Sequence, residues 1–106
     1  MSNYQKVISL DFDGVIHRYS RGYVDGSIYD DPMPGALEAT LRLIRRGYTI
    51  VVLTARTNHD DVTAWLIKNK FPSEHMLVTN VKPKAIAYID DRAIRFTNWA
   101  DVLNYF

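Results

Sequence analysis

The sequence of 106 residues contains no cysteine, which excludes disulfide bonds and any metal site built on thiolates. Glycine and proline are few, with 5 and 4 residues, and there is no internal repeat, low-complexity tract or linker. Neither sign of charge dominates, because 13 basic residues stand against 12 acidic ones for a formal net charge of +1. A dedicated nucleic-acid-binding domain would be markedly basic, so nucleic acid as a partner receives no support from charge.

Long hydrophobic runs are also missing. No apolar stretch approaches membrane-spanning length, and residues 1–6 lack the apolar core of a signal peptide. The length fits one domain, and a composition that is 47% hydrophobic and 24% charged is ordinary for a globular protein. We therefore expect one soluble, cytoplasmic domain, residues 1–106, without a membrane partner.

Apolar runs of strand length alternate with amphipathic segments of helical length. We expect strands at about 7–10, 48–53, 76–78 and 85–89, and a short edge strand at 94–96. We expect helices at about 34–46, at 59–70 after a cap at Asn58, and after a cap at Thr97. This alternation favours an α/β fold, a doubly wound parallel sheet with helices on both faces. Trp65 and Trp99 lie on helix stripes and are predicted to be core.

Residues 17–31 form a polar and aromatic loop or small hairpin between the first strand and the first helix. A connection of this length in so small a domain is typical of a binding flap, and a surface excursion without function is the alternative. The flap residues that a substrate leaving group would meet are His17, Arg18, Arg21 and Tyr23. His59 and His75 show no metal-ligand spacing.

Acidic and hydroxyl side chains follow three of the expected strands. Asp11 and Asp13 follow the first, Thr54 the second, and Asp90 and Asp91 the fourth. Because parallel strands end at one edge of a sheet, we expect these side chains to converge there. Hard oxygen ligands suit Mg²⁺, which would offset the mutual repulsion of the acids and attract a phosphate. For the first pair considered alone, an ordinary surface turn is the alternative.

The same residues fit phosphoryl transfer. A carboxylate can attack phosphorus and form an aspartyl-phosphate, which water then hydrolyses. A second acid must protonate the leaving oxygen and later activate the water, and donors must hold the phosphoryl group in line. The acids, Thr54 and a lysine before the fourth strand make up this set.

Four motifs stand in order along the chain: Leu10-Asp11-Phe12-Asp13-Gly14-Val15, Val51-Val52-Leu53-Thr54, Lys82-Pro83 and Tyr88-Ile89-Asp90-Asp91. Over about residues 7–96 they resemble the haloacid dehalogenase superfamily, in its Mg²⁺-dependent phosphatase branch. The resemblance implies that Asp11 is the nucleophile. It also implies that Asp13 is the general acid/base, whose backbone carbonyl binds the metal as well.

The same resemblance assigns the remaining site residues. Thr54 and Lys82 would contact the phosphoryl group, and Asp90 and Asp91 would bind or support the metal. Lys84 is the alternative to Lys82, which is favoured because it directly precedes a proline. The acid at Asp13 favours a phosphatase over a halide-displacing enzyme. Arg56 would either contact substrate or lie on the surface beside its helix, and Arg92 would anchor the last loop.

Most members of that superfamily insert a cap domain, for which this chain has no room, so it resembles a capless member. Its open site would be covered by a large substrate, by a neighbouring subunit or by the flap. Small-molecule and macromolecular phosphates therefore both remain as substrates, and oligomerisation is possible. Three alternatives stay open: a nucleic-acid end phosphatase, a phosphoacceptor signalling module of receiver type, and an inactive binding module of the same fold.

Overall fold

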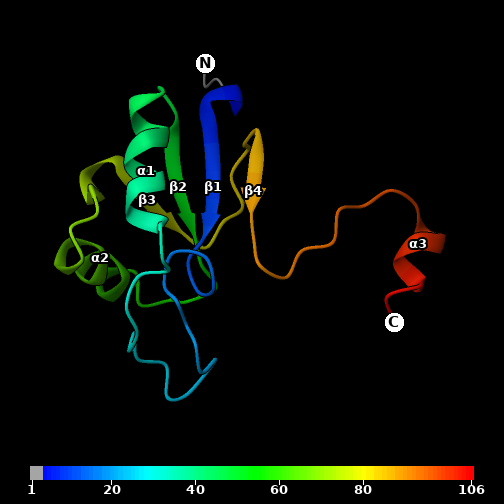
Figure 1. The fold of residues 1–106 in the computed structure, drawn as a ribbon, viewed down its shortest axis with the longest axis horizontal. Coiled ribbons are helices and arrows are strands. Elements are labelled where there is room, and N and C mark those ends of the chain that lie inside the picture. Colours follow the sequence, from blue (N-terminus) through cyan, green and yellow to red (C-terminus); the bar gives the residue numbers. More distant parts are fainter. Residues whose placement is uncertain (1–3) are drawn as a thin grey trace.

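The computed structural model describes residues 4–106, which form an α/β domain around an all-parallel sheet of four strands (Figure 1). The strands are β1 (Val7–Asp11), β2 (Thr49–Leu53), β3 (Met76–Thr79) and β4 (Ala87–Ile89), in the spatial order β3-β2-β1-β4. The helices are α1 (Ala36–Arg45), α2 (His59–Lys68) and α3 (Trp99–Leu103), with 3-10 turns η1 (Tyr4–Lys6) and η2 (Ser73–His75). The expected α/β class and the parallel sheet are confirmed.

Both long helices cover the same face of the sheet. Leu10 of β1 and Val52 of β2 share one buried cluster with Leu66 of α2. Leu37 and Ile44 of α1 pack against that cluster. The handedness of the strand connections explains this. The chain moves across the sheet in the same direction from β1 to β2 and from β2 to β3, so two right-handed crossovers place their helices on the same face.

The opposite face of the sheet is buried at its centre and exposed on its outer strands. Ser9 and Val51 are register partners on this face and are buried. Leu77 and Tyr88, on the outer strands, are 66% and 43% exposed. No helix joins β3 to β4, since residues 80–86 make the connection without one. Helices on both faces are therefore not confirmed for the described part of the chain.

The C-terminal segment extends away from the sheet, and α3 lies at its far end (Figure 1). The strand expected at 94–96 is absent, and Asn98 rather than Thr97 accepts the capping hydrogen bond from the Asp101 N–H. Trp99 is 70% exposed, so its prediction as a core residue is wrong, whereas Trp65 is 7% exposed and its prediction is confirmed. The radius of gyration of 14.6 Å exceeds the value of about 13 Å for a compact chain of ~100 residues.

Residues 17–31 have no regular secondary structure apart from isolated bridges that His17 makes to Asp13 and Pro32. Their shape comes instead from side chains that bind the backbone. Asp30 accepts hydrogen bonds from the N–H and hydroxyl of Ser20, and the Tyr29 hydroxyl donates to the Gly22 carbonyl. Across residues 4–106, no helix has the length and apolar character needed to cross a membrane.

Candidate active site

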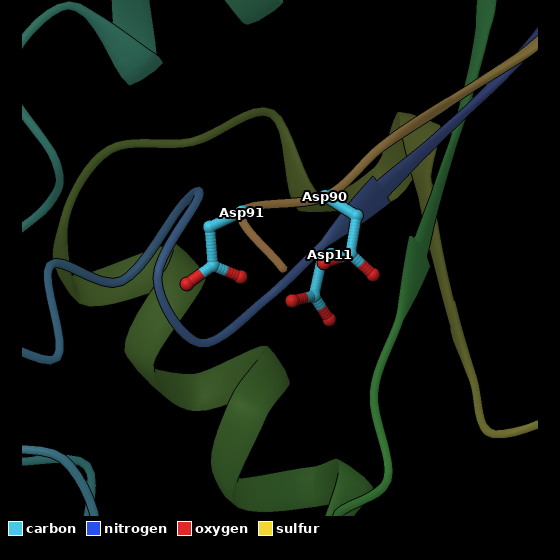
Figure 2. Close-up of side chains that lie close together, drawn as sticks. All are labelled: Asp11, Asp90 and Asp91. Atoms are coloured by element: carbon cyan, nitrogen blue, oxygen red, sulfur yellow. The ribbon is translucent and has the colours of Figure 1, made fainter. Parts of the chain in front are cut away.

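Three carboxylates meet at the carboxyl edge of the sheet. Asp11 is the last residue of β1, and Asp90 and Asp91 follow the last residue of β4. Because Leu10 and Ile89 are register partners in neighbouring parallel strands, the acids that follow them emerge side by side. One oxygen of each carboxylate lies within 4.8 Å of the others (Figure 2). The expected convergence is found for these three acids, which could hold a metal ion.

Gly14 leaves room for one of these carboxylates. Its φ of +90° lies in the left-handed region that favours glycine, and its N–H donates to the His17 carbonyl at 2.8 Å. A Cβ built at this position would collide with the Asp91 carboxylate. A glycine is therefore needed here for two reasons, the turn of the backbone and the close approach of Asp91.

The surroundings of Asp11 raise the energy of its charged form. Burial, followed by the charges of Asp90 and Asp91, raises the pKa of Asp11 from 3.8 to about 7. No ion pair with a lysine or arginine offsets this cluster within residues 4–106. A divalent cation would supply the missing positive charge, and hard carboxylate oxygens are the ligands that Mg²⁺ and Ca²⁺ prefer.

Asp13 lies outside this cluster. Arg56 donates from Nε to Asp13 Oδ2 at 2.9 Å and from Nη2 to Oδ1 at 3.1 Å. His17 Nδ1 lies 2.8 Å from the same Oδ1. The expected convergence of side chains therefore does not include the Asp13 carboxylate, because these two donor side chains bind it. The role of its backbone carbonyl as a metal ligand, which the resemblance implies, stays a prediction.

His17 is fully buried, with 0% of its surface exposed, so it does not offer its ring on the flap surface as expected. Its Nε2 accepts a hydrogen bond from the Asp30 N–H at 3.0 Å. That contact places the ring proton on Nδ1, which donates to Asp13. The ring also stacks on Phe12, with centroids 5.4 Å apart, and packs edge-on to Trp65 at 5.5 Å. Packing thus fixes the position of the imidazole, and the hydrogen bond from Asp30 fixes its tautomer.

Thr54 directly follows β2 and is only 3% exposed. Its Oγ1 accepts a hydrogen bond from the Arg56 N–H at 3.1 Å, so its own hydroxyl hydrogen is the part that can be donated. The Arg56 guanidinium also reaches the flap, where Nη1 donates to the Gly26 carbonyl at 2.6 Å. The two partners of the Arg56 guanidinium, Asp13 and Gly26, do not follow from the local sequence pattern, because both lie far away in the sequence.

The expected lysine lies elsewhere. Lys82 is exposed, and its Nζ sits over the Tyr88 ring, 4.5 Å from the centroid. The Tyr88 hydroxyl donates to the Pro83 carbonyl at 2.6 Å, which anchors this part of the loop. Lys84 is also exposed. The structure brings neither lysine into an ion pair with the three acids, and the choice between them stays a prediction.

Arg92 contributes its backbone rather than its side chain, since its N–H donates to Asp90 Oδ1 at 2.8 Å. The site therefore combines a carboxylate cluster able to hold a cation, a separately held acid at Asp13, and the Thr54 hydroxyl. No protein-family model, curated protein or solved structure matches this chain.

Proposed function

We propose that this protein is a Mg²⁺-dependent phosphomonoester hydrolase that works through an aspartyl-phosphate on Asp11, as a capless member of the haloacid dehalogenase superfamily. The observation that carries the proposal is the meeting of Asp11, Asp90 and Asp91 within 4.8 Å at the carboxyl edge of a parallel sheet. This is the place where ligands bind in open α/β sheets. Bound Mg²⁺ would neutralise the acids and draw in a phosphate dianion.

The first half of the reaction forms a bond between Asp11 Oδ and phosphorus and breaks the bond from phosphorus to the leaving oxygen. A proton passes from Asp13 to that oxygen. Thr54 donates its hydroxyl to a phosphoryl oxygen, which helps to hold the group in line. In the second half, water gives a proton to Asp13 and attacks phosphorus, and Asp11 is released together with inorganic phosphate.

Arg56 and His17 support this scheme by fixing the Asp13 carboxylate. Their three hydrogen bonds, between 2.8 and 3.1 Å, leave it one orientation. A general acid has to lie within hydrogen-bond reach of the oxygen that it protonates. Because Arg56 and His17 both donate to Asp13, the Arg56 guanidinium has to release one carboxylate oxygen, and that oxygen has to be protonated before it can give a proton to the leaving group. His17 can keep the carboxylate in place meanwhile.

The test is phosphate release from a panel of sugar, nucleotide, peptide and nucleic-acid phosphomonoesters, with and without Mg²⁺. We expect turnover only with the metal, and its loss in Asp11→Asn. Asp60→Asn, which changes an exposed acid in the first turn of α2, is the matched control and should keep full activity. Near-normal, metal-dependent turnover by Asp11→Asn would refute Asp11 as the nucleophile.

The same assay separates the proposal from the alternatives. A phosphoacceptor signalling module would keep phosphate on Asp11 for minutes or longer, and an inactive binding module would release none. A nucleic-acid end phosphatase would prefer DNA or RNA ends and would lose activity steeply as salt is added.

A further inference from the structure

A cavity of about 500 Å³ opens beside the Asp13 carboxylate, between the flap and the segment that follows β2. The side chains that line its walls include Asp13, Tyr19, Tyr23, Arg56, Thr57 and Asn58. Two of them belong to the proposed reaction, Asp13 as the general acid/base and Arg56 as the residue that positions it. The volume falls in the range of about 300–1,000 Å³ that small-molecule sites occupy, so the cavity is larger than a phosphate alone needs.

The position of the cavity indicates which part of a substrate would enter it. The phosphoryl group belongs at Asp11, beside Asp90 and Asp91, whereas the leaving oxygen belongs at Asp13, which protonates it. The atoms attached to that oxygen must therefore continue past Asp13, and the cavity begins there. The leaving group, which is the part that differs between phosphomonoesters, is therefore bound in this cavity.

The walls of this space are aromatic on the flap side. Tyr23 is 77% exposed, although tyrosine rings tend to bury their apolar body. A single exposed tyrosine needs no explanation, but this one faces a cavity next to the proposed general acid. Tyrosine faces stack on planar bases of any identity.

The ring of Tyr19, which could also stack on a base, is fixed by its neighbours. Its ring lies 5.6 Å from the His17 ring and 6.1 Å from the Tyr29 ring, nearly parallel to the latter at 28°. Its backbone is left-handed, with φ of 54°, a conformation that non-glycine residues keep only where their surroundings enforce it. The flap is fixed further by the Arg56 contact to the Gly26 carbonyl and by the Tyr29 hydroxyl, which accepts from the Arg21 N–H at 2.8 Å. The Tyr19 part of the aromatic wall is therefore preorganised.

Polar groups lie on the opposite wall. Asn58 donates from Nδ2 to Asp61 at 3.1 Å and makes no helix-capping contact, which leaves its carbonyl oxygen as an acceptor. The Thr57 side chain adds a hydroxyl group at the same wall. A planar aromatic group that carries N–H and hydroxyl groups would use both walls at once.

Resting on the proposed function, we propose that this cavity binds a nucleoside as the leaving group, so that the substrates are nucleoside monophosphates. The base stacks on Tyr23 and Tyr19, and the ribose spans the distance from the base to the oxygen at Asp13. A plain sugar would leave the aromatic wall unused, and a phenyl ring would leave the polar wall unused. The net charge of +1 favours a free nucleotide over the end of a polynucleotide.

The experiment compares a nucleoside 5′-monophosphate with ribose 5-phosphate, which is the same ester without the base. We expect kcat/KM to be about tenfold or more higher for the nucleotide, because this is the size of effect that one base-stacking contact has. Tyr23→Ala should remove most of that advantage by raising KM more for the nucleotide than for ribose 5-phosphate, while Tyr23→Phe should keep the advantage. Tyr105→Ala, which changes a tyrosine 66% exposed on the C-terminal segment, is the control and should behave as the wild type.

Equal kcat/KM for both esters, or an equal loss for both in Tyr23→Ala, would overturn the nucleoside assignment. A preference for phenyl phosphate or for a 5′-phosphorylated oligonucleotide would overturn it as well. The proposed function fails separately, if no ester releases phosphate. In that case calorimetric titration of the Mg²⁺-loaded protein with the nucleotide still decides about the cavity: binding that Tyr23→Ala weakens supports it, and absence of binding refutes it.

Discussion

The carboxylates on the two sides of the candidate site have opposite surroundings. Asp11, Asp90 and Asp91 face one another and make no ion pair with a lysine or arginine of residues 4–106, and the pKa of Asp11 rises to about 7 as a result of burial and these neighbours. Asp13, two residues from Asp11, is bound by the guanidinium of Arg56 and by His17. The cluster therefore needs positive charge from a bound ligand. The protein itself supplies the groups that bind Asp13.

The two sides also differ in how the chain builds them. The cluster rests on the ends of β1 and β4, whose register fixes where the side chains emerge. The surroundings of Asp13 come from a loop, a buried histidine and an arginine that follows β2. Changes at the cluster should therefore act on metal binding, and changes around Asp13 should act on the rate of the chemical step.

The largest expected effect is on the metal requirement. Asp90→Asn removes a charge from the cluster, and we expect the Mg²⁺ concentration for half-maximal activity to rise about 10–100-fold, as for weakened metal sites elsewhere. Chelation of the metal should abolish turnover, and added Mg²⁺ should restore it. Thermal shifts at increasing Mg²⁺ give a second readout that needs no substrate. An unchanged Mg²⁺ requirement in Asp90→Asn would show that the cluster is not the metal site.

An effect of comparable size, on kcat rather than on the Mg²⁺ requirement, is expected on the other side. Arg56→Ala removes two hydrogen bonds from Asp13 and leaves the one to His17. We expect kcat to fall about 10–100-fold, since losing hydrogen bonds to a charged group costs about 1–3 kcal/mol. The Mg²⁺ requirement should stay within about twofold of the wild type. Arg56→Lys, which keeps the charge but not the planar two-pronged contact, should recover part of the loss. A shift in the Mg²⁺ requirement as large as in Asp90→Asn would remove the distinction between the two sides.

The part of the site that follows from strand ends was predictable from the sequence. Asp11 and Asp90 each stand one residue after an apolar run, and parallel strands bring such positions to one edge whatever the loops do. The contacts of Asp13 were not predictable, because they depend on side-chain directions across the fold. The sequence predicts His17 as a flap residue that contacts substrate, yet packing against Phe12 and Trp65 turns its ring inward.

The C-terminal segment shows the same limit for the fold. An apolar stripe predicted that Trp99 is buried, as it correctly did for Trp65, but a stripe shows only that a helix has an apolar face. It does not show whether the chain brings that face to a partner. α2 is carried onto the sheet by its right-handed crossover to β3, whereas the segment that leads to α3 runs away from the sheet (Figure 1).

Glycine substitutions measure the crowding of the cluster. Gly14 and Gly47 have nearly the same left-handed φ, +90° and +92°, but a Cβ at Gly14 meets Asp91 and one at Gly47 meets nothing within 4 Å. Gly47→Ala should cost only backbone strain, about 1 kcal/mol and so about 4–8 °C in Tm. Gly14→Ala should cost more and should also weaken Mg²⁺ binding. Equal losses of Tm, with Mg²⁺ binding intact, would show that Asp91 moves aside freely.

The smallest effect is a dependence of stability on pH without divalent metal. Because the folded pKa of Asp11, about 7, lies above its usual 3.8, the folded state holds this proton more tightly than the unfolded state does. Its contribution is therefore complete below pH 4 and is lost progressively as the pH rises toward 7. Asp30, whose pKa is lowered to about 2 by hydrogen bonds from Ser20, acts with the opposite sign, because its contribution is lost as the pH falls below 4.

The measurement is Tm between pH 4 and 8 for the wild type and Asp11→Asn, with and without Mg²⁺. The difference in Tm between the two proteins should shift against the wild type as the pH rises without metal, because only the wild type takes on the extra charge in that range. Saturating Mg²⁺ should reverse that shift, since the cation stabilises the ionised cluster in the folded state. If the metal leaves the difference unchanged, Asp11 is not part of the cation site, and the contrast with Asp13 no longer holds.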